Sequence, residues 1–132
     1  MAWLSFTPHS PYVPQAPSRR ECHTVCVVGE KLYLYGGNDD AGRHSAVHIL
    51  DTVSMRWEKI EGEEAGRRSA HTAVMSEDGK WMYIFGGWNG ADELGEVVRF
   101  GVESRRWERV LTTGTPPSPR HFHMATRVGN SM

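Results

Sequence analysis

The side chains of this chain that could do chemistry are arginines and histidines that recur in pairs. An arginine stands three positions before a histidine three times, in the segments Arg20-x-x-His23, Arg68-x-x-His71 and Arg120-x-x-His123. Imidazole is a common ligand of Zn²⁺, but a structural zinc site needs four ligands held close together. The segments are about fifty residues apart, and no cysteine or carboxylate cluster completes a set of ligands. Repetition explains the histidines better than metal binding does, so we expect no metal site.

The common motifs of enzyme active sites are missing from the sequence. The chain contains no Gly-x-Ser-x-Gly elbow, no Gly-x-x-x-x-Gly-Lys-Ser/Thr loop and no His-Glu-x-x-His pattern. These patterns position a nucleophile, a nucleotide phosphate or a catalytic metal. We therefore expect no catalytic residues, no cofactor and no enzymatic activity.

The charge balance argues against two classes of partner. Fifteen Lys and Arg residues stand against sixteen Asp and Glu residues, for a net charge of −1. A nucleic-acid binder usually carries a basic stripe, and none is visible in the sequence. No apolar run approaches the roughly 20 residues of a membrane span. We expect neither nucleic acid nor membrane as a partner.

The two cysteines indicate a reducing compartment. Cys22 and Cys26 are four positions apart on an expected strand, which separates them by roughly 13 Å. A disulfide requires Cα atoms within about 7 Å. Because these cysteines cannot pair with each other and no third one exists, we expect free thiols and a cytoplasmic location.

These groups are carried by a repeat of about fifty residues. Gly36-Gly37 recurs as Gly86-Gly87, and Trp57 recurs as Trp107. Short apolar runs end at each glycine pair and are preceded and followed by further segments of strand character. The pattern predicts four antiparallel strands per repeat and essentially no helix. The expected strands are 23–28, 32–35, 46–51 and 56–60 in the first repeat, and 71–75, 82–85, 96–101 and 106–110 in the second.

The repeated elements resemble the kelch repeat. The matching features are the arginine three before a histidine, the apolar strand that ends in a glycine pair, and the tryptophan twenty residues after that pair. In kelch proteins each repeat forms one blade of a β-propeller. The resemblance covers nearly the whole chain and implies an all-β fold: a propeller fragment with two complete four-stranded antiparallel blades and partial blades at each end. The expected divisions are 1–19 (last strand of a preceding blade, including Trp3–Phe6, and a Pro-rich connector), 20–67 (repeat 1), 68–119 (repeat 2) and 120–132 (start of a third repeat).

The glycines and tryptophans of the repeat are expected to be structural. Glycine suits a strand end where the backbone turns sharply or approaches a neighbour closely. Tryptophan offers a large apolar surface for the seam between blades. The residues given this role are Gly36, Gly37, Trp57, Gly86, Gly87 and Trp107. Asp51 should close a tight turn before Trp57, whereas the second repeat has Gly101 at that position.

The third repeat stops where the second strand of the first repeat would begin. We expect a part of a larger propeller or a truncated one, since propellers usually close with about four to eight blades. Open blade faces and strand edges favour self-association unless the missing blades are supplied.

The resemblance places partner contacts on one rim, built by the loops that lead into each first strand and those that follow each glycine pair. The candidate partner-binding residues are Arg20, Arg68, Arg120, Asn38, Asp39, Trp88, Asn89 and Asp92. Two structural alternatives remain open: each arginine could bond a neighbouring loop carbonyl, and Trp88 could pack over its own blade. Binding to a protein of unknown identity is the expected function. The alternatives are a non-functional or regulatory fragment of a multidomain kelch protein, such as a ubiquitin-ligase adaptor or transport effector, and, more distantly, a small-molecule lyase-type propeller.

Overall fold

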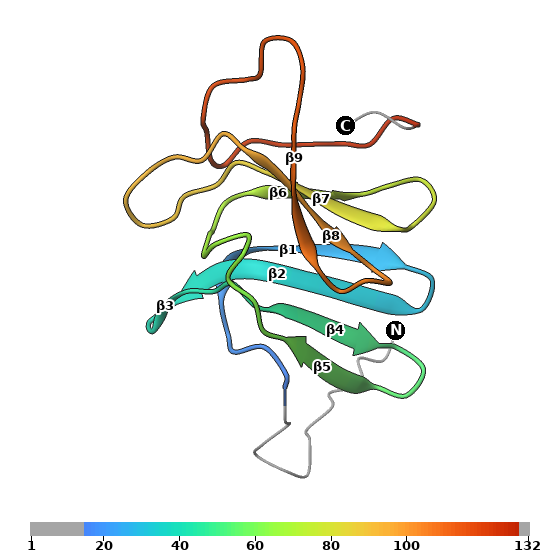
Figure 1. The fold of residues 1–132 in the computed structure, drawn as a ribbon. Coiled ribbons are helices and arrows are strands. Elements are labelled where there is room, and N and C mark those ends of the chain that lie inside the picture. Colours follow the sequence, from blue (N-terminus) through green and yellow to red (C-terminus); the bar gives the residue numbers. More distant parts are fainter. Residues whose placement is uncertain (1–14, 130–132) are drawn as a thin grey trace, which may run out of the picture.

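The computed structural model describes residues 15–129 of the chain, and these fold into two antiparallel sheets without helix (Figure 1). The expected strand at Trp3–Phe6 lies outside the described residues. Because the described residues form no helix, none of their segments is an apolar helix long enough to span a membrane.

The first sheet is one blade, with strand order β1-β2-β4-β5. Its strands are β1 (Glu21–Val28), β2 (Lys31–Asp39), β4 (Val47–Asp51) and β5 (Arg56–Ile60), and the short β3 (Gly42–Arg43) pairs with the end of β2. The second sheet has the order β6-β7-β8-β9. Its strands are β6 (Thr72–Met75), β7 (Trp81–Phe85), β8 (Val97–Gly101) and β9 (Trp107–Val110). The predicted all-β fold with two four-stranded blades is confirmed.

The strands form where the apolar pattern places them, and turn chemistry connects them. In blade 1 the carboxylate of Asp51 accepts hydrogen bonds from the backbone N–H groups of Val53 and Ser54, both at 2.9 Å, which closes the β4–β5 turn. Blade 2 has Gly101 there, and its turn is closed by backbone bonds instead, including one from the N–H of Gly101 to Arg106 at 2.9 Å. One feature differs from the prediction: β2 continues through its glycine pair to Asp39 because β3 folds back on it.

The core lies between the two sheets. Tyr33, Tyr35, Val47 and Ile49 of blade 1 belong to one buried cluster with residues of blade 2, namely Met82, Ile84, Val98 and Phe100. Burying such a side chain stabilises the fold by about 1.5–3 kcal/mol. Because the two sheets share this core, a single blade alone could not bury it.

Trp107 lies at the seam between the blades. Its ring centroid is 4.7 Å from that of Tyr35 in blade 1 and 5.2 Å from that of Phe100 in its own blade. Trp57, at the matching position of blade 1, has its ring 6.5 Å from His48 of its own sheet. Each tryptophan is half-buried, so its indole covers the outer part of a blade.

The inner strands are linked by a chain of backbone bonds. The N–H of Ala70 donates to the carbonyl of Cys22, and the N–H of Phe122 donates to the carbonyl of Ala70, both at 2.9 Å. The segment 120–129 thus lies beside β6 in the place of a third inner strand. Met124 within this segment is 93% exposed, and Leu111, directly after β9, is 91% exposed. An apolar surface is therefore open on this side of the described chain.

Candidate functional site

The loops that follow the glycine pairs lie on one edge of both blades. In Figure 1, loops 38–44 and 88–94 are on the left, and the β1–β2, β4–β5 and β6–β7 turns are on the right. The segments that lead into β1 and β6 also reach the left edge, because antiparallel pairing places the start of β1 beside the end of β2. We call this edge the rim and define it as residues 18–22, 38–44, 66–70, 88–94 and 118–122.

Beneath the rim, the Arg-x-x-His segments join neighbouring blades. The carbonyl of Arg68 accepts a hydrogen bond from the N–H of Gly37 at 2.9 Å. The His71 Nε2 atom lies 2.8 Å from the Thr24 hydroxyl of the preceding blade. One blade further on, the same two contacts recur at 2.9 Å each, between Arg120 and Gly87 and between His123 and Thr72. We call this repeated pair of contacts the seam clasp.

The glycine pair is required because the clasp presses against it. Gly36 has φ of +67°, and a Cβ placed there would lie 2.6 Å from both the carbonyl oxygen of Arg68 and Cε1 of His71. Real Cβ atoms do not approach other atoms so closely, and left-handed backbone also disfavours L side chains. The His71 ring packs edge-on against Tyr35 with a centroid distance of 5.1 Å.

His71 is neutral in the folded chain. Burial lowers its pKa from 6.5 to about 3, and the nearby positive charge of Arg68 acts in the same direction. The residue is 5% exposed, and the Nδ1 atom of its ring has no hydrogen-bond partner among the described residues. A proton on this ring would place an uncompensated charge inside the seam.

The backbone of Arg68 belongs to the rim segment 66–70, but its side chain is buried beneath the rim. Its guanidinium is fully buried, donating to the carbonyl of Gly86 at 3.0 Å and also to that of Ala65. Its Nη2 atom is 2.8 Å from Oε1 of Glu96, and Oε2 of Glu96 is 2.9 Å from Arg109. The expectation that Arg68 contacts a partner is corrected, because a side chain without exposed surface cannot reach one. Its bonds to loop carbonyls are the structural alternative that the sequence left open.

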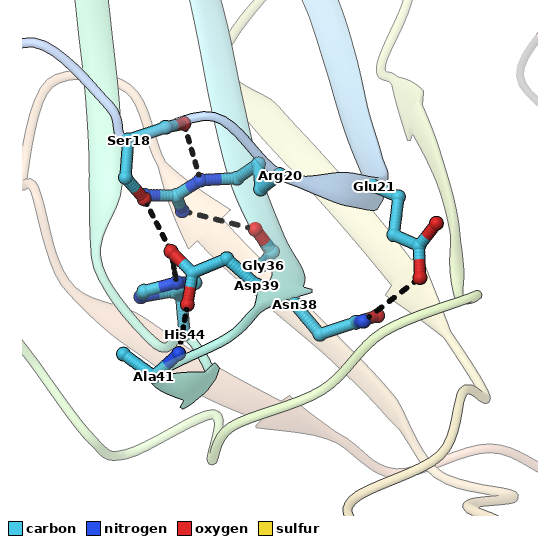
Figure 2. A network of polar contacts seen from close by, with 8 residues as sticks. All are labelled: Ser18, Arg20, Glu21, Gly36, Asn38, Asp39, Ala41 and His44. Carbon is cyan, nitrogen blue, oxygen red and sulfur yellow. Dashed lines mark hydrogen bonds and ion pairs between the residues drawn. The ribbon is translucent and has the colours of Figure 1, made fainter.

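Arg20 is half-buried at the rim and belongs to a polar network (Figure 2). It donates to the carbonyl of Gly36 at 3.1 Å, to the carbonyl of Ser18 at 3.3 Å and to the Ser18 hydroxyl at 3.1 Å. Burial lowers the pKa of the Arg20 guanidinium, and the charge of Asp39 opposes that shift. No carboxylate among the described residues forms a direct ion pair with Arg20.

Asp39 is engaged by its own loop. Its Oδ2 atom accepts a bond from the Ser18 hydroxyl at 2.6 Å and lies 2.8 Å from Nε2 of His44, while Oδ1 accepts from the N–H of Ala41 at 2.9 Å. These bonds, chiefly those from Ser18 and His44, lower the pKa of Asp39 to about 2. Asp39 therefore shapes the rim and has little capacity left for a partner.

The remaining candidates lie on the rim with mixed roles. Asn38 donates to Glu21 at 3.1 Å, and Arg120 donates to the carbonyl and the hydroxyl of Ser118 at 3.0 and 3.1 Å. Asn89 uses its side-chain oxygen to accept bonds at 2.8 Å from the N–H groups of Ala91 and Asp92, which shapes the loop. Asn89, Asp92 and Arg120 are exposed, so their outer surfaces face solvent.

Trp88 joins an aromatic group that spans blade 2 and the third repeat. Its backbone pairs with Ser69, and its ring centroid is 5.9 Å from that of His121. His121 also lies 2.7 Å from a Glu93 carboxylate oxygen and 5.1 Å, between ring centroids, from Phe122, which is 73% exposed. A hollow of about 320 Å³ lies here, with Trp88, His121 and Phe122 in its lining. The half-buried Trp88 packs over neighbouring loops and still presents part of its ring at the rim.

Phe122 and His121 were not among the candidates drawn from the sequence. The position of Phe122 is held by Cys22 and Ala70 in the other repeats, and all three have left-handed backbone, with φ of 57°, 55° and 54°. A large aromatic residue at a position that is otherwise small is the sequence signal that could have revealed Phe122. The backbone hydrogen bond from the N–H of Phe122 to the carbonyl of Ala70, at 2.9 Å, helps to hold this strained conformation.

The thiols and histidines form no recognisable metal centre. Within residues 15–129, no three His, Cys, Asp or Glu side chains gather as a metal site would require. Cys22 and Cys26 are both free, as predicted, and burial raises the pKa of the Cys26 thiol to about 11. The Cys26 thiol is therefore unreactive at neutral pH.

Comparison with known proteins gives consistent matches over the whole chain. The family model for the KLHDC2/KLHL20/DRC7 Kelch-repeats domain matches residues 1–132. Kelch domain-containing protein 3 of Rattus norvegicus is 30% identical over 141 residues, covering 100% of this chain and 36% of the relative. Host cell factor of Drosophila melanogaster is 31% identical over 150 residues, covering 98% of this chain and 10% of that protein. The chain thus spans about a third or less of the length of these two relatives.

Proposed function

Because the chain belongs to the KLHDC2/KLHL20/DRC7 kelch-repeats family, we propose that it is a protein-binding scaffold whose rim contacts a partner. The family assignment confirms the resemblance found in the sequence. Kelch-repeat domains generally serve as platforms for other proteins, and the chain supplies two complete blades of such a platform.

This proposal rests on a contrast between residues that the two repeats share and rim residues that differ between them. The seam clasp uses the same residue types in both blades, because its task is the same at every seam. The rim positions above it differ: Asn38 corresponds to Trp88, and Arg43 corresponds to Glu93. A partner protein has an asymmetric surface, so side chains that contact it should differ from blade to blade. A rim with a purely structural role would instead carry the same residue types in every blade.

The chemistry of the rim suits a protein surface. Trp88, His121 and Phe122 offer aromatic area beside a hollow, which is the usual setting of a binding hot spot. Glu93 and Arg43 add one charge of each sign at equivalent loop positions. Such a site recognises shape and polarity, and we propose that it binds without catalysis.

We also propose a cytoplasmic location for the chain. Cys22 is a free, half-buried thiol at the rim, and Cys26 is a free thiol in the core. Two unpaired thiols are typical of proteins in a reducing compartment.

Site-specific photo-crosslinking tests the proposed face. A benzoylphenylalanine residue at exposed Asp92 on the rim should capture a partner in the native cells, whereas one at exposed Val53 on the opposite edge should not. The captured protein is then purified, and its affinity for the chain should fall at least about tenfold in Phe122→Ala and stay unchanged in Val53→Ala. Equal capture from both edges, or an affinity insensitive to Phe122→Ala and Trp88→Ala, would contradict the proposal.

A further inference from the structure

Blade 2 contains an ionic set that blade 1 reproduces only in part. In blade 2 the carboxylate of Glu96 bridges two arginines, with distances of 2.8 Å to Arg68 and 2.9 Å to Arg109. Glu96 lies one residue before β8, and Arg109 lies on β9 opposite Val98. Both cations are thus held by a carboxylate supplied by their own blade.

Blade 1 keeps both cations and lacks the carboxylate. Arg20 matches Arg68, since each donates to the carbonyl of the first glycine of its own blade, at 3.1 and 3.0 Å. Lys59 lies on β5 opposite His48, which is the register of Arg109 one blade on. The position of Glu96 is taken by Ala46. A methyl group therefore stands where the bridging anion of blade 2 stands.

A hollow is open at this place. It has a volume of about 560 Å³, and Arg20, Ala46 and Lys59 all line it. Four cationic side chains line the hollow against two carboxylates: Arg20, Arg43, Lys59 and Arg67 against Glu61 and Glu63. The lining therefore carries more positive than negative charge. This count leaves out His44 and His48, which also line the hollow.

The two carboxylates compensate the cations weakly. Glu61 pairs with Lys59 and Glu63 pairs with Arg67, but the two carboxylate side chains are 73% and 70% exposed. Exposed pairs of this kind contribute about 0–1 kcal/mol and exchange readily with other ions. Arg43 donates from Nε to the Ser69 hydroxyl at 3.2 Å and forms no ion pair among the described residues.

Arg20 retains donors for an anion. Its three hydrogen bonds leave two of the five guanidinium N–H groups available within the described chain. Asp39 reaches it only through the Ser18 hydroxyl, as Figure 2 shows. The sequence segments 1–14 and 130–132 contain no Asp or Glu, so neither can supply the missing side chain.

We infer that the hollow of blade 1 binds a carboxylate side chain of a partner protein, an Asp or Glu that takes the place of Glu96 between Arg20 and Lys59. This inference rests on the proposed function and specifies one contact of the partner. Glu96 shows within the same molecule which anion such a pair of cations accepts. A planar guanidinium favours a carboxylate, which it can bind through two parallel N–H groups.

The test uses the full chain and a phage library of random peptides of about 12 residues, flanked by glycines so that each peptide is internal. Peptides selected by the wild-type chain should share one acidic position. Replacing that Glu by Gln in a synthetic, end-blocked peptide should weaken binding at least about tenfold.

Ala46→Glu supplies the carboxylate within the chain and should weaken the acidic peptide by a similar factor while leaving the Gln peptide unaffected. Val53→Glu is the matched control, because it adds the same charge at an exposed position on the opposite edge of the same blade and should change neither peptide. If Ala46→Glu does not fold, Lys59→Gln on the exposed edge strand should weaken the acidic peptide several-fold and leave the Gln peptide unchanged.

Two failures are distinguishable. Selected peptides that bind the rim without any acidic preference, or that ignore both Ala46→Glu and Lys59→Gln, would overturn this inference and leave the proposed function standing. A chain that selects no peptide and captures no partner at Asp92 would overturn both.

Discussion

Protonation of His71 should open the seam between the blades. The folded chain holds the ring neutral, because burial lowers its pKa from 6.5 to about 3. The unfolded chain takes up the proton at the ordinary pKa, so stability is complete above about pH 6.5 and falls as the pH drops toward the folded pKa. With these two values, the free energy of unfolding should decrease by about 2 kcal/mol between about pH 7.5 and about pH 5.

Urea unfolding followed by tryptophan fluorescence measures this loss, since Trp107 lies at the same seam. The measurement compares the wild type with His71→Gln, whose amide can bond the Thr24 hydroxyl but cannot titrate. Burial also lowers the pKa of His48, and its contribution cancels in the comparison because both proteins contain it. His23→Gln is the control, because it removes an exposed histidine from the equivalent position of blade 1.

The stability advantage of the wild type over His71→Gln should therefore shrink by about 2 kcal/mol on going from about pH 7.5 to about pH 5. His23→Gln should follow the pH dependence of the wild type. Parallel profiles for the wild type and His71→Gln would refute the reasoning, because they would mean that the ring is not buried as a neutral group.

Three further predictions use the same unfolding assay at neutral pH. Gly36→Ala should lose at least about 2 kcal/mol, because its Cβ would lie 2.6 Å from the carbonyl oxygen of Arg68 on left-handed backbone; an unchanged midpoint would contradict the close approach. Glu96→Gln should lose at least about 2 kcal/mol, because it leaves the buried guanidinium of Arg68 without its counterion, and a loss near zero would count against that burial. Glu58→Gln, which breaks an ion pair with Arg105 between side chains 44% and 45% exposed, should change stability by less than about 1 kcal/mol, and a larger change would show that this pair is not solvent-screened.

The strands were predictable because their signals are local. The run 32–35 is apolar on both faces and ends at a glycine pair, and the structure places it inside β2 with Tyr35 fully buried. The turn at Asp51 follows from one short carboxylate and its own backbone. Neither feature depends on how the two blades pack together.

The fate of the arginines was not predictable in the same way. Arg20 and Arg68 stand in the same motif, yet one is half-buried at the rim and the other has no exposed surface. Arg68 is paired with Glu96, which is 28 residues away and lies just before β8, whereas Arg20 forms no ion pair among the described residues. Likewise, the partner of His71 is Thr24, a residue of the neighbouring blade 47 positions away. Contacts of this kind become visible only when the sheets are placed side by side.

The hydrogen bonds within the repeat limit which polar groups are free to contact a partner. The backbone carbonyl and imidazole of the Arg-x-x-His segment are held by a glycine N–H and a threonine hydroxyl at each seam, so these groups cannot also bind a partner. Specificity must then come from positions at which the blades differ. Ala46 is such a position, because the loss of one carboxylate from an otherwise repeated ionic set leaves its cations in place around a hollow. Under the inference above, the replacement of one structural side chain in a single blade turns a stabilising contact into a binding contact.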